Sequence, residues 1–314
     1  EHADAVEFRM DLALEPLAQI DFAVALQAAA RRGIPVVVVN GRMSRDKGYP
    51  GYRKLGRLAG ALFNRLTAIG VQDEIYAERF RSLGAEPAKV HVTGMMKYDA
   101  ADVADRVEGQ DALAAAMGLT GDEKLIVAGG TGPGEEKLLL DRIGDLERRC
   151  GEAVLAIVPR KPERFDEVAR LITQSSRPVV RRSQRPNGTE GDRPAGAVLL
   201  GDTMGELRAF YALASGVFVG RSLVPMGGSD MIEAAALGRP TAFGPHTFNF
   251  PQADELAQHG CTRVDDADAL IEQLGRWLAD PSVAAEAGRA ARRFVRSRQG
   301  ATRRNVEMIC RGLG

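Results

Sequence analysis

Runs of β-branched and aliphatic residues alternate along the chain with longer segments whose apolar residues recur at helical spacing. The clearest run, at residues 34–39, reads Ile-Pro-Val-Val-Val-Val and is typical of a parallel strand buried on both faces. The alternation predicts an α/β fold built from doubly wound parallel sheets. The predicted strands lie at residues 5–10, 34–39, 66–71, 90–93, 124–128, 153–158, 178–180, 197–200, 217–219 and 241–243.

Amphipathic patterns with capping residues at their ends predict the helices between these strands. A basic stretch at 45–57 leads into a helix that reaches about residue 66, and a long basic segment at 283–314 is loosened near Gly300. The other predicted helices lie at residues 16–32, 73–83, 135–150, 162–173, 204–213, 231–237, 251–258 and 267–278.

The 314 residues are enough for two domains. The first part offers about four strands, fewer than the six of a full dinucleotide-type domain, and the chain begins at Glu1 without methionine, so we expect its N-terminal part to be missing. We predict a partial, acceptor-side Rossmann-like domain at 1–118. Residues 109–121 are expected to contain a helix and a turn and to form a linker. A donor domain at 119–314 would follow, its last helix packing back on the first domain, and the two domains would face a cleft.

Composition excludes several function classes. Lys plus Arg and Asp plus Glu both number 42, so net charge indicates no nucleic-acid partner, and no apolar run approaches the roughly 18 residues of a membrane span. Cys150, Cys261 and Cys310 lack ligand spacing, which argues against a zinc site or a disulfide framework. We therefore expect no metal and no cofactor. Asp266-Ala-Asp268 stands where a helix needs a cap, so we interpret it as capping rather than as a metal site.

The stretch from Ser215 to Leu256 organises the candidate chemistry. It predicts a buried strand, a loop with paired glycines and a short helix, an order that places backbone N–H groups at the carboxyl end of a strand, where open α/β sheets bind ligands. Glu233 has two interpretations. With Asp230 as N-cap, its carboxylate would complete a capping box; alternatively, it accepts hydrogen bonds from the vicinal hydroxyls of a sugar. Ser229 and Asp230 carry the same ambiguity.

Three other strand ends carry candidate binding groups. Gly129 to Gly134 superficially suggests a phosphate loop, but Glu135 and Glu136 would repel a phosphate, so a tight loop is the better interpretation. After the strand at 153–158, Arg160 can clamp a phosphate and Lys161 can add a point charge, or both belong to an ordinary charged loop. In the segment 202–207, Asp202 or Thr203 would cap a helix, with Glu206 completing a capping box around Thr203.

The basic stretch itself has two interpretations. Its cations Arg45, Lys47, Arg53, Lys54 and Arg57, with Tyr49 and Tyr52 between them, form either a solvated helix face or a surface for an anionic substrate or phospholipid headgroups.

Short motifs follow one another in order from about Arg32 to the end of the chain, each near a strand end. They are Arg32-Gly-Ile-Pro35, Asn40-Gly-Arg-Met-Ser44, Gly51-Tyr-Arg53, Ala77-Glu-Arg-Phe80, Val92-Thr-Gly94, Lys97-Tyr-Asp99, Val158-Pro-Arg160, Asp202-Thr-Met-Gly-Glu-Leu207, Phe218-Val-Gly220, Ser222-Leu223, Gly227-Gly228, Glu233, Leu237-Gly-Arg-Pro240 and Phe243-Gly-Pro-His-Thr-Phe-Asn-Phe250. Together they resemble the 3-deoxy-D-manno-octulosonic acid (Kdo) transferases of lipopolysaccharide synthesis.

This resemblance implies a GT-B glycosyltransferase that needs no metal and moves Kdo from CMP-Kdo onto the lipid A precursor. It places the enzyme at the cytoplasmic face of the bacterial inner membrane, held peripherally or by an anchor upstream of Glu1. It also implies that Arg160 holds the CMP phosphate, that Met204 and Gly205 border the nucleotide and that Glu233 binds the ribose. The donor-binding set is Pro159, Arg160, Lys161, Thr203, Met204, Gly205, Gly228, Ser229, Asp230 and Glu233.

The sequence departs from the family pattern at several positions. Ser229 and Asp230 replace a His-Asn pair, Met231 and Ala234 replace prolines, Lys161 stands where His is usual, and residues 11–22 lack the usual Glu-Leu-Trp-Pro. The family's general base is a glutamate in a Gly-Glu motif, which would lie upstream of Glu1, so we assign no catalytic residue. Two alternatives stay open: a GT-B glycosyltransferase that uses another nucleotide sugar, such as a UDP-sugar, and a non-catalytic nucleotide- or glycan-binding homologue.

Overall fold

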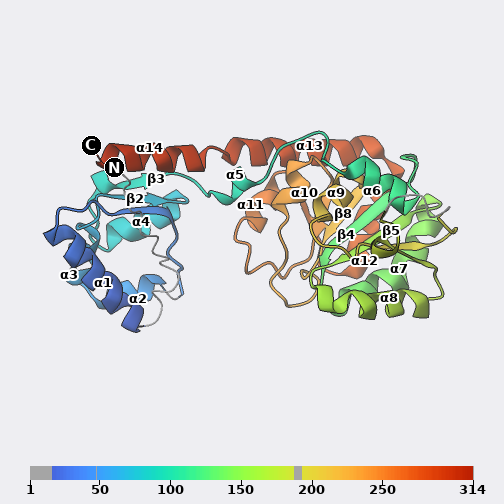
Figure 1. Cartoon of the computed structure of the whole chain (residues 1–314), viewed down its shortest axis with the longest axis horizontal. Helices are drawn as coiled ribbons and strands as arrows, with labels where there is room; N and C mark the ends of the chain where they lie inside the picture. The colour runs from blue at the N-terminus through green and yellow to red at the C-terminus, as the bar shows by residue number, and fades with distance from the viewer. Residues whose placement is uncertain (1–15, 47, 187–192, 314) are drawn as a thin grey trace. The chain divides into compact units, whose positions relative to one another are not determined.

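The computed structural model describes residues 16–46, 48–186 and 193–313. The chain forms two compact units, which we describe separately (Figure 1). Unit 1 comprises residues 1–100 and 298–314, and unit 2 comprises residues 101–297. This division at residue 100 falls before the boundary suggested by the sequence, and the functional extent of the two domains stays a prediction.

In the described part of unit 1, three parallel strands form a sheet in the order β1-β2-β3. The core of unit 1 contains Phe22, Phe63 and Phe80, one from each of three helices, together with Ile69 of the central strand. The elements are β1 (Val37–Gly41), β2 (Ala68–Val71), β3 (Val90–Val92), α1 (Pro16–Arg31), α2 (Gly48–Lys54), α3 (Arg57–Phe63), α4 (Glu74–Ser82), α5 (Lys97–Ala100) and α14 (Ala301–Leu313).

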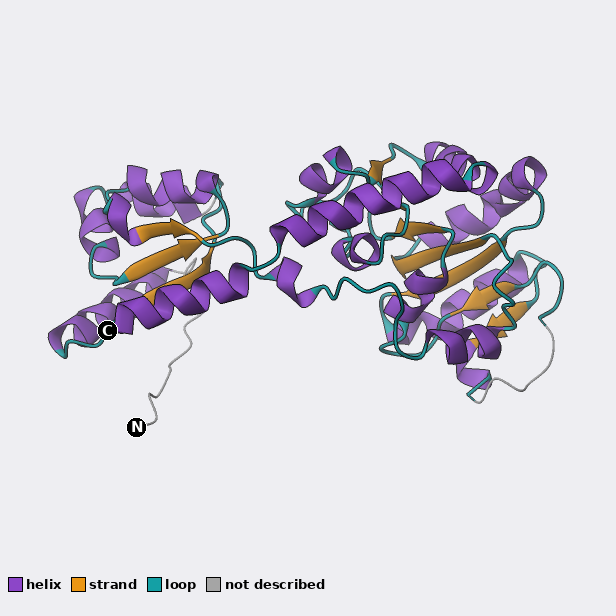
Figure 2. Ribbon diagram, turned by 90° about the horizontal axis from the view of Figure 1, so that it is seen from above, coloured by secondary structure: helices purple, strands orange, loops and turns teal. Residues whose placement is uncertain are grey.

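Helix α14, from the end of the sequence, lies beside the strands of unit 1 and contacts β1 and β2 (Figure 2). The contact is close at Gly70, where an added Cβ would lie 2.6 Å from Asn305 Oδ1 and 2.7 Å from Met308 Cε. A side chain at Gly70 would therefore push the helix off the sheet.

In the described part of unit 2, seven parallel strands form one sheet in the order β10-β9-β8-β4-β5-β7-β6. The strands that come next in the sequence, β5 to β7, lie on one side of β4, and the later strands β8 to β10 lie on the other side. The order of strands in the sheet therefore reverses between β4 and β8. The strands are β4 (Leu125–Thr131), β5 (Val154–Pro159), β6 (Val179–Arg181), β7 (Val198–Leu200), β8 (Gly216–Val219), β9 (Thr241–Phe243) and β10 (Thr262–Arg263).

Helices cover both faces of this sheet (Figure 1). On one face α7 contacts α8 and α12, and on the other α9 contacts α6 and α10. Trp277, Phe218, Leu146 and Ile157 are buried in the core between the sheet and the first set. The helices are α6 (Gln110–Met117), α7 (Glu135–Cys150), α8 (Phe165–Gln174), α9 (Leu207–Leu213), α10 (Ile232–Ala236), α11 (Ala253–Gln258), α12 (Ala267–Ala279) and α13 (Pro281–Arg298).

The alternation predicted from the sequence is confirmed for the described residues, and helix α7 has the predicted bounds. The loosening near Gly300 is also confirmed, since α13 and α14 are separate helices and Gly300 has φ +93°. The helix expected within 109–121 is confirmed as α6, but the interpretation of this segment as a linker is wrong, because α6 contacts α9 and buries Leu113 and Met117. The predicted strand at 5–10 and the departure at 11–15 lie outside the described residues.

Candidate functional site

The ten predicted donor-binding residues follow three strands of the unit 2 sheet. Pro159 ends β5, Thr203 to Gly205 follow β7, and Gly228 to Glu233 follow β8. Because every pair of neighbouring strands in this sheet is parallel, these carboxyl ends share one edge. The reversal between β4 and β8 is the place where open α/β sheets bind ligands. The structure therefore gathers the predicted residues at the edge that the fold favours for a ligand.

Arg160 and Lys161 leave this edge directly after β5. The Arg160 backbone N–H donates to the Thr131 carbonyl of β4 over 3.1 Å, which holds the start of the loop against the neighbouring strand. Both side chains are exposed. Lys161 pairs with exposed Glu163 at 3.4 Å, an ion pair that contributes little in water. Arg160 is thus a cation on an anchored backbone, able to meet an anionic ligand.

Glu135 of α7 connects the reversal point to the loop after β8. Among the described residues, four backbone N–H groups donate to its buried carboxylate over 2.5–3.0 Å, from Gly132, Arg221, Ser222 and Leu223. Burial raises the pKa of Glu135, and the four donors oppose that shift only in part. The carboxylate occupies a nest of N–H groups that would otherwise attract an anion.

In the glycine-rich segment at 129–134, residues 129–131 end β4 and residues 132–134 form the tight turn before α7, so the tight-loop interpretation holds for the second half of the segment. Its second glutamate, Glu136, is fully buried and pairs with Arg164 at 2.6 Å, so neither acidic side chain leaves the helix start open to a phosphate. The loop packs closely on the next candidate segment, since Ser229 Oγ donates to the Gly130 carbonyl over 2.9 Å.

The loop before α10 contains the paired glycines. Gly227 and Gly228 have φ of +88° and +87°, and a Cβ added at Gly227 would lie 2.0 Å from Asn249 Nδ2. A side chain fits neither the backbone conformation nor the space, which explains the glycine at position 227.

The capping box predicted around Glu233 is wrong. Helix α10 begins at Ile232, and the residue at its N-cap position is Met231, which makes no side-chain cap. Asp230 Oδ1 instead accepts from the Ile232 N–H at 3.0 Å, and Glu233 stands half-buried in the first turn. Capping register therefore does not account for Glu233, and its role in donor binding stays a prediction.

The turn after β7 is held by a charged network. Asp202 is buried, and its carboxylate accepts from Ser183 N at 2.8 Å, Ser183 Oγ at 2.6 Å and Arg181 Nε at 2.6 Å. Burial would raise the pKa of Asp202, but the Ser183 and Arg181 contacts outweigh it and hold the pKa below its usual value. The network fixes the backbone next to Thr203.

Neither Asp202 nor Thr203 caps α9, so that prediction is also wrong. The helix begins at Leu207 without a side-chain cap, and Thr203 Oγ1 bonds Glu206, which pairs with Arg182 at 2.9 Å. Beyond this anchored turn, Met204 is 70% exposed and Gly205 has φ +87°. An exposed methionine above a fixed turn offers an apolar surface to a flat ligand group.

Two buried hydroxyls lie at the same edge without a hydrogen-bond partner among the described residues: Tyr211 Oη and Thr131 Oγ1. Thr131 ends β4, and Tyr211 is fully buried on α9. Burial raises the pKa of Tyr211, the Glu233 and Asp230 carboxylates raise it further, and the Arg160 cation opposes them. The charges of these three predicted site residues thus all act on one buried phenol.

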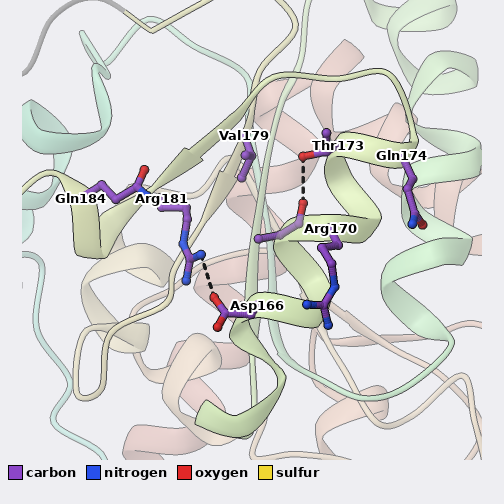
Figure 3. Close-up of a pocket in the computed structure, with 8 residues that line it drawn as sticks. Asp166, Arg170, Thr173, Gln174, Val179, Arg181 and Gln184 are labelled. Carbon is purple, nitrogen blue, oxygen red and sulfur yellow. Dashed lines mark hydrogen bonds and ion pairs between the residues drawn. The ribbon is translucent and has the colours of Figure 1, made fainter.

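A pocket with a volume of about 500 Å³ lies elsewhere in unit 2, between α8 and the edge strand β6 (Figure 3). None of the predicted donor-binding residues lines it. Arg181, which lines this pocket, pairs with Asp166 at 2.8 Å and with Asp202, so its charge is already engaged. We place the candidate site at the strand edge, because the topology and the unpaired hydroxyls converge there.

Asp266 caps α12, as predicted, by accepting from Ala269 N at 2.8 Å. Among the described residues, no group of three His, Cys, Asp or Glu side chains is placed to hold a metal ion. No helix in the described part of the chain is long and apolar enough to cross a membrane.

Comparison with known proteins gives the same family from both parts of the chain. Residues 23–100 match the family model described as 3-deoxy-D-manno-octulosonic-acid transferase (kdotransferase). The 3-deoxy-D-manno-octulosonic acid transferase of Bordetella pertussis is 33% identical over 297 residues, which are 92% of this chain and 66% of that protein. The C-terminal CMP-Kdo binding domain of WaaA from Acinetobacter baumannii is 30% identical, with a TM-score of 0.54, over 61% of this chain and 97% of that domain.

The chain belongs to the 3-deoxy-D-manno-octulosonic acid transferase family.

This family member spans just under two thirds of the length of its Bordetella relative. A solved structure of Anabaena HepE covers 93% of the chain and 75% of its own length with a TM-score of 0.53, but it is 15% identical and shows only a shared fold. Together with the parallel sheets, these neighbours confirm the α/β, GT-B fold class predicted from the sequence.

Sequence reasoning missed several residues that shape this site. Glu135 was interpreted as repelling a ligand, although its main contacts are with a loop 86 residues away or more. Arg181 and Ser183 follow the strand predicted at 178–180 and belong to no motif, and Tyr211 has the pattern of an ordinary core aromatic. No local signal reveals these contacts, because each joins residues far apart in sequence.

The Asp202 network predicts a pH-dependent stability. Asp202→Asn should lower the free energy of unfolding at pH 7 by about 1–3 kcal/mol, since it removes a charged acceptor from buried donors. The folded-state pKa is depressed, so this contribution is present above the unfolded pKa of about 3.9 and is lost as pH falls through the folded pKa. Urea unfolding from pH 7 to pH 3 measures the difference between variant and parent, which should shrink below about pH 4.

Asp166→Asn is the matched control, because Asp166 also pairs with Arg181 but its side chain is 75% exposed. It should cost less than about 1 kcal/mol at every pH. Equal effects of the two variants, or an Asp202→Asn effect that does not change with pH, would contradict the account.

Proposed function

We propose that this chain is a glycosyltransferase that moves Kdo from CMP-Kdo onto the lipid A precursor in lipopolysaccharide biosynthesis. The observation that carries the proposal is the position of Arg160, Asp230 and Glu233 at the carboxyl edge of the unit 2 sheet, where the charges of all three act on Tyr211. Family membership supports it, as does the likeness to a CMP-Kdo binding domain. The proposed place of action is the cytoplasmic face of the bacterial inner membrane.

The proposed donor fits the charges at this edge. CMP-Kdo carries a single phosphate, and the exposed Arg160 guanidinium can hold it through two parallel hydrogen bonds. Glu233 would accept hydrogen bonds from the ribose hydroxyls. Met204 and Gly205 would border the base, and the Gly228 to Asp230 backbone would lie beside the sugar-phosphate. Pro159, Lys161 and Thr203 complete the proposed set by fixing or charging the same loops.

In the proposed reaction, an acceptor hydroxyl oxygen forms a bond to the anomeric carbon of Kdo. The bond from that carbon to the phosphate oxygen breaks, CMP leaves with the bonding electrons, and the hydroxyl proton passes to a general base. Arg160 contributes by stabilising the charge that grows on the leaving phosphate. We assign the base to no residue of this chain.

Calorimetric titration with CMP and with UDP tests the donor assignment. We expect the parent chain to prefer CMP, and Arg160→Ala and Glu233→Ala each to weaken CMP binding at least tenfold, since each removes hydrogen bonds to or from a charged group. Arg170→Ala and Glu272→Ala are matched controls, because both side chains are exposed on helices away from the strand edge and should leave binding unchanged.

Stronger binding of UDP would favour a different nucleotide sugar. No binding of either nucleotide by a folded chain would overturn the donor site. CMP binding that survives both Arg160→Ala and Glu233→Ala would show that the nucleotide binds elsewhere.

The membrane surface is the second proposed partner, and the basic segment of unit 1 supports it. Tyr52 of this segment is 4% exposed and packs in the core, whereas Arg53, Lys54 and Arg57 are exposed. Leu58, next to Arg57, is 71% exposed. Cations interleaved with exposed leucine suit the boundary between anionic headgroups and acyl chains. Tyr52 therefore belongs to the core, and the exposure of the cations supports the proposed contact with a bilayer.

Vesicle co-sedimentation tests this surface. The parent chain should bind vesicles containing phosphatidylglycerol and leave phosphatidylcholine vesicles largely unbound. Arg53→Glu combined with Arg57→Glu should weaken binding to the anionic vesicles at least tenfold, because each basic residue contributes about 1 kcal/mol near such a surface.

The charge-matched control is Arg289→Glu combined with Arg293→Glu, which reverses two exposed charges on α13 of unit 2. Equal losses in the two double variants would indicate a net-charge effect and contradict a specific surface on α2 and α3.

A further inference from the structure

Tyr211 brings a hydroxyl to the reversal point of the sheet. The residue lies on α9, which contacts both β4 and α10, and its side chain is fully buried. A Cβ added at Gly129 of β4 would lie 2.3 Å from Tyr211 Oη and 2.5 Å from Cε1. The absence of a side chain at Gly129 is therefore what lets the phenol reach the strand end, directly below the loops of the candidate site.

The packing of the free chain does not explain this hydroxyl. Tyr211 Oη has no hydrogen-bond partner among the residues that the structure describes. A buried polar group left unpaired carries its full desolvation cost, and phenylalanine would fill the same space without that cost. An unpaired buried hydroxyl of this kind calls for a partner that forms in another state of the protein.

The charges around the phenol indicate that partner. Glu233 lies on α10, which contacts the helix that carries Tyr211. Of the three charged site residues that act on the pKa of this phenol, Glu233 has the largest effect, followed by Asp230 and Arg160. Asp230 already accepts from the Ile232 N–H. A carboxylate has about four acceptor positions, so one that receives two ribose hydroxyls can still receive a third donor.

We infer that Tyr211 is a positioning residue of the donor site, whose hydroxyl donates a hydrogen bond to the Glu233 carboxylate when nucleotide is bound. The inference rests on the proposed function, because it assumes that Glu233 receives the ribose. The bond fixes the orientation of the carboxylate and thereby sets the preference for a ribonucleotide over a 2′-deoxyribonucleotide. Tyr211 itself, being fully buried, does not touch the ligand.

Tyr211→Phe tests the inference by calorimetry with CMP and with 2′-deoxy-CMP. We expect the parent chain to bind CMP more tightly than 2′-deoxy-CMP. In Tyr211→Phe, CMP binding should weaken about tenfold, a typical loss for a hydrogen bond to a charged group, and 2′-deoxy-CMP binding should change less than about threefold. In a Glu233→Ala background, the same substitution should weaken CMP binding by less than about threefold, since each change alone already removes the hydrogen bond between the two side chains.

Thermal unfolding of the nucleotide-free variants separates positioning from a structural role. Tyr211→Phe should melt at the same temperature as the parent or higher, because it removes an unpaired buried hydroxyl. Tyr52→Phe is the matched control: its hydroxyl is also buried without a partner among the described residues, but it lies in the unit 1 core. It should leave CMP binding unchanged.

The outcomes separate the inference from the proposed function. If Glu233→Ala weakens CMP binding but Tyr211→Phe binds both nucleotides like the parent, the inference is wrong and the proposed donor site stands. A lower melting temperature with equal losses for both nucleotides would show a structural role and also overturn it. If the folded parent binds no CMP, the proposed function fails, and the inference fails with it.

Discussion

The buried carboxylate of Glu135 holds together the part of the molecule on which the candidate site depends. It accepts hydrogen bonds from the backbone N–H of Gly132, in the turn after β4, and from those of Arg221, Ser222 and Leu223 after β8. These strands border the reversal in strand order, where the sheet opens towards a ligand. The N–H groups of 221–223 converge because Arg221 adopts a left-handed conformation with φ 58°, which is unfavourable for a residue with a side chain and is offset by the bonds to Glu135. Gly227, Gly228 and Ser229 follow in the same loop, so their positions depend on the hydrogen bonds that Glu135 accepts.

The distribution of charge at the edge explains how an acidic loop can serve an anionic donor. Asp230 stands where the sequence resemblance implies an asparagine, and its negative charge alone would repel a phosphate. In the structure one of its oxygens accepts a backbone N–H, and Arg160 lies close enough to oppose its effect on Tyr211. Glu135 and Glu136 are also engaged, by backbone N–H groups and by Arg164. The Arg160 side chain is thus exposed and available to the proposed phosphate, while Glu135, Glu136 and Asp230 accept from neighbouring protein donors.

Much of this architecture could be predicted from the sequence, because each strand of the sheet except the shortest has a local apolar signal. Strand β10 consists of Thr262–Arg263, too short for any periodicity to show. The helix α6 was expected, but its short, glycine-flanked segment was interpreted as a linker. The edge that carries the site followed from strand ends alone. The finer contacts of the site could not be predicted in this way. The capping register of α10 depends on how the preceding loop packs, and Asp202 accepts hydrogen bonds from Arg181 and Ser183, which belong to no motif. The proposed donor came from the family resemblance, whereas the contacts of Tyr211 and Glu135 became visible only in the packing of the structure.

A crystal structure of the chain with CMP tests the central claim most directly. The account predicts nucleotide at the carboxyl edge of the unit 2 sheet, with its phosphate on Arg160, its ribose hydroxyls on Glu233 and its base beside Met204. Nucleotide seated instead in the pocket between α8 and β6, against Arg170 and Arg181, would contradict it.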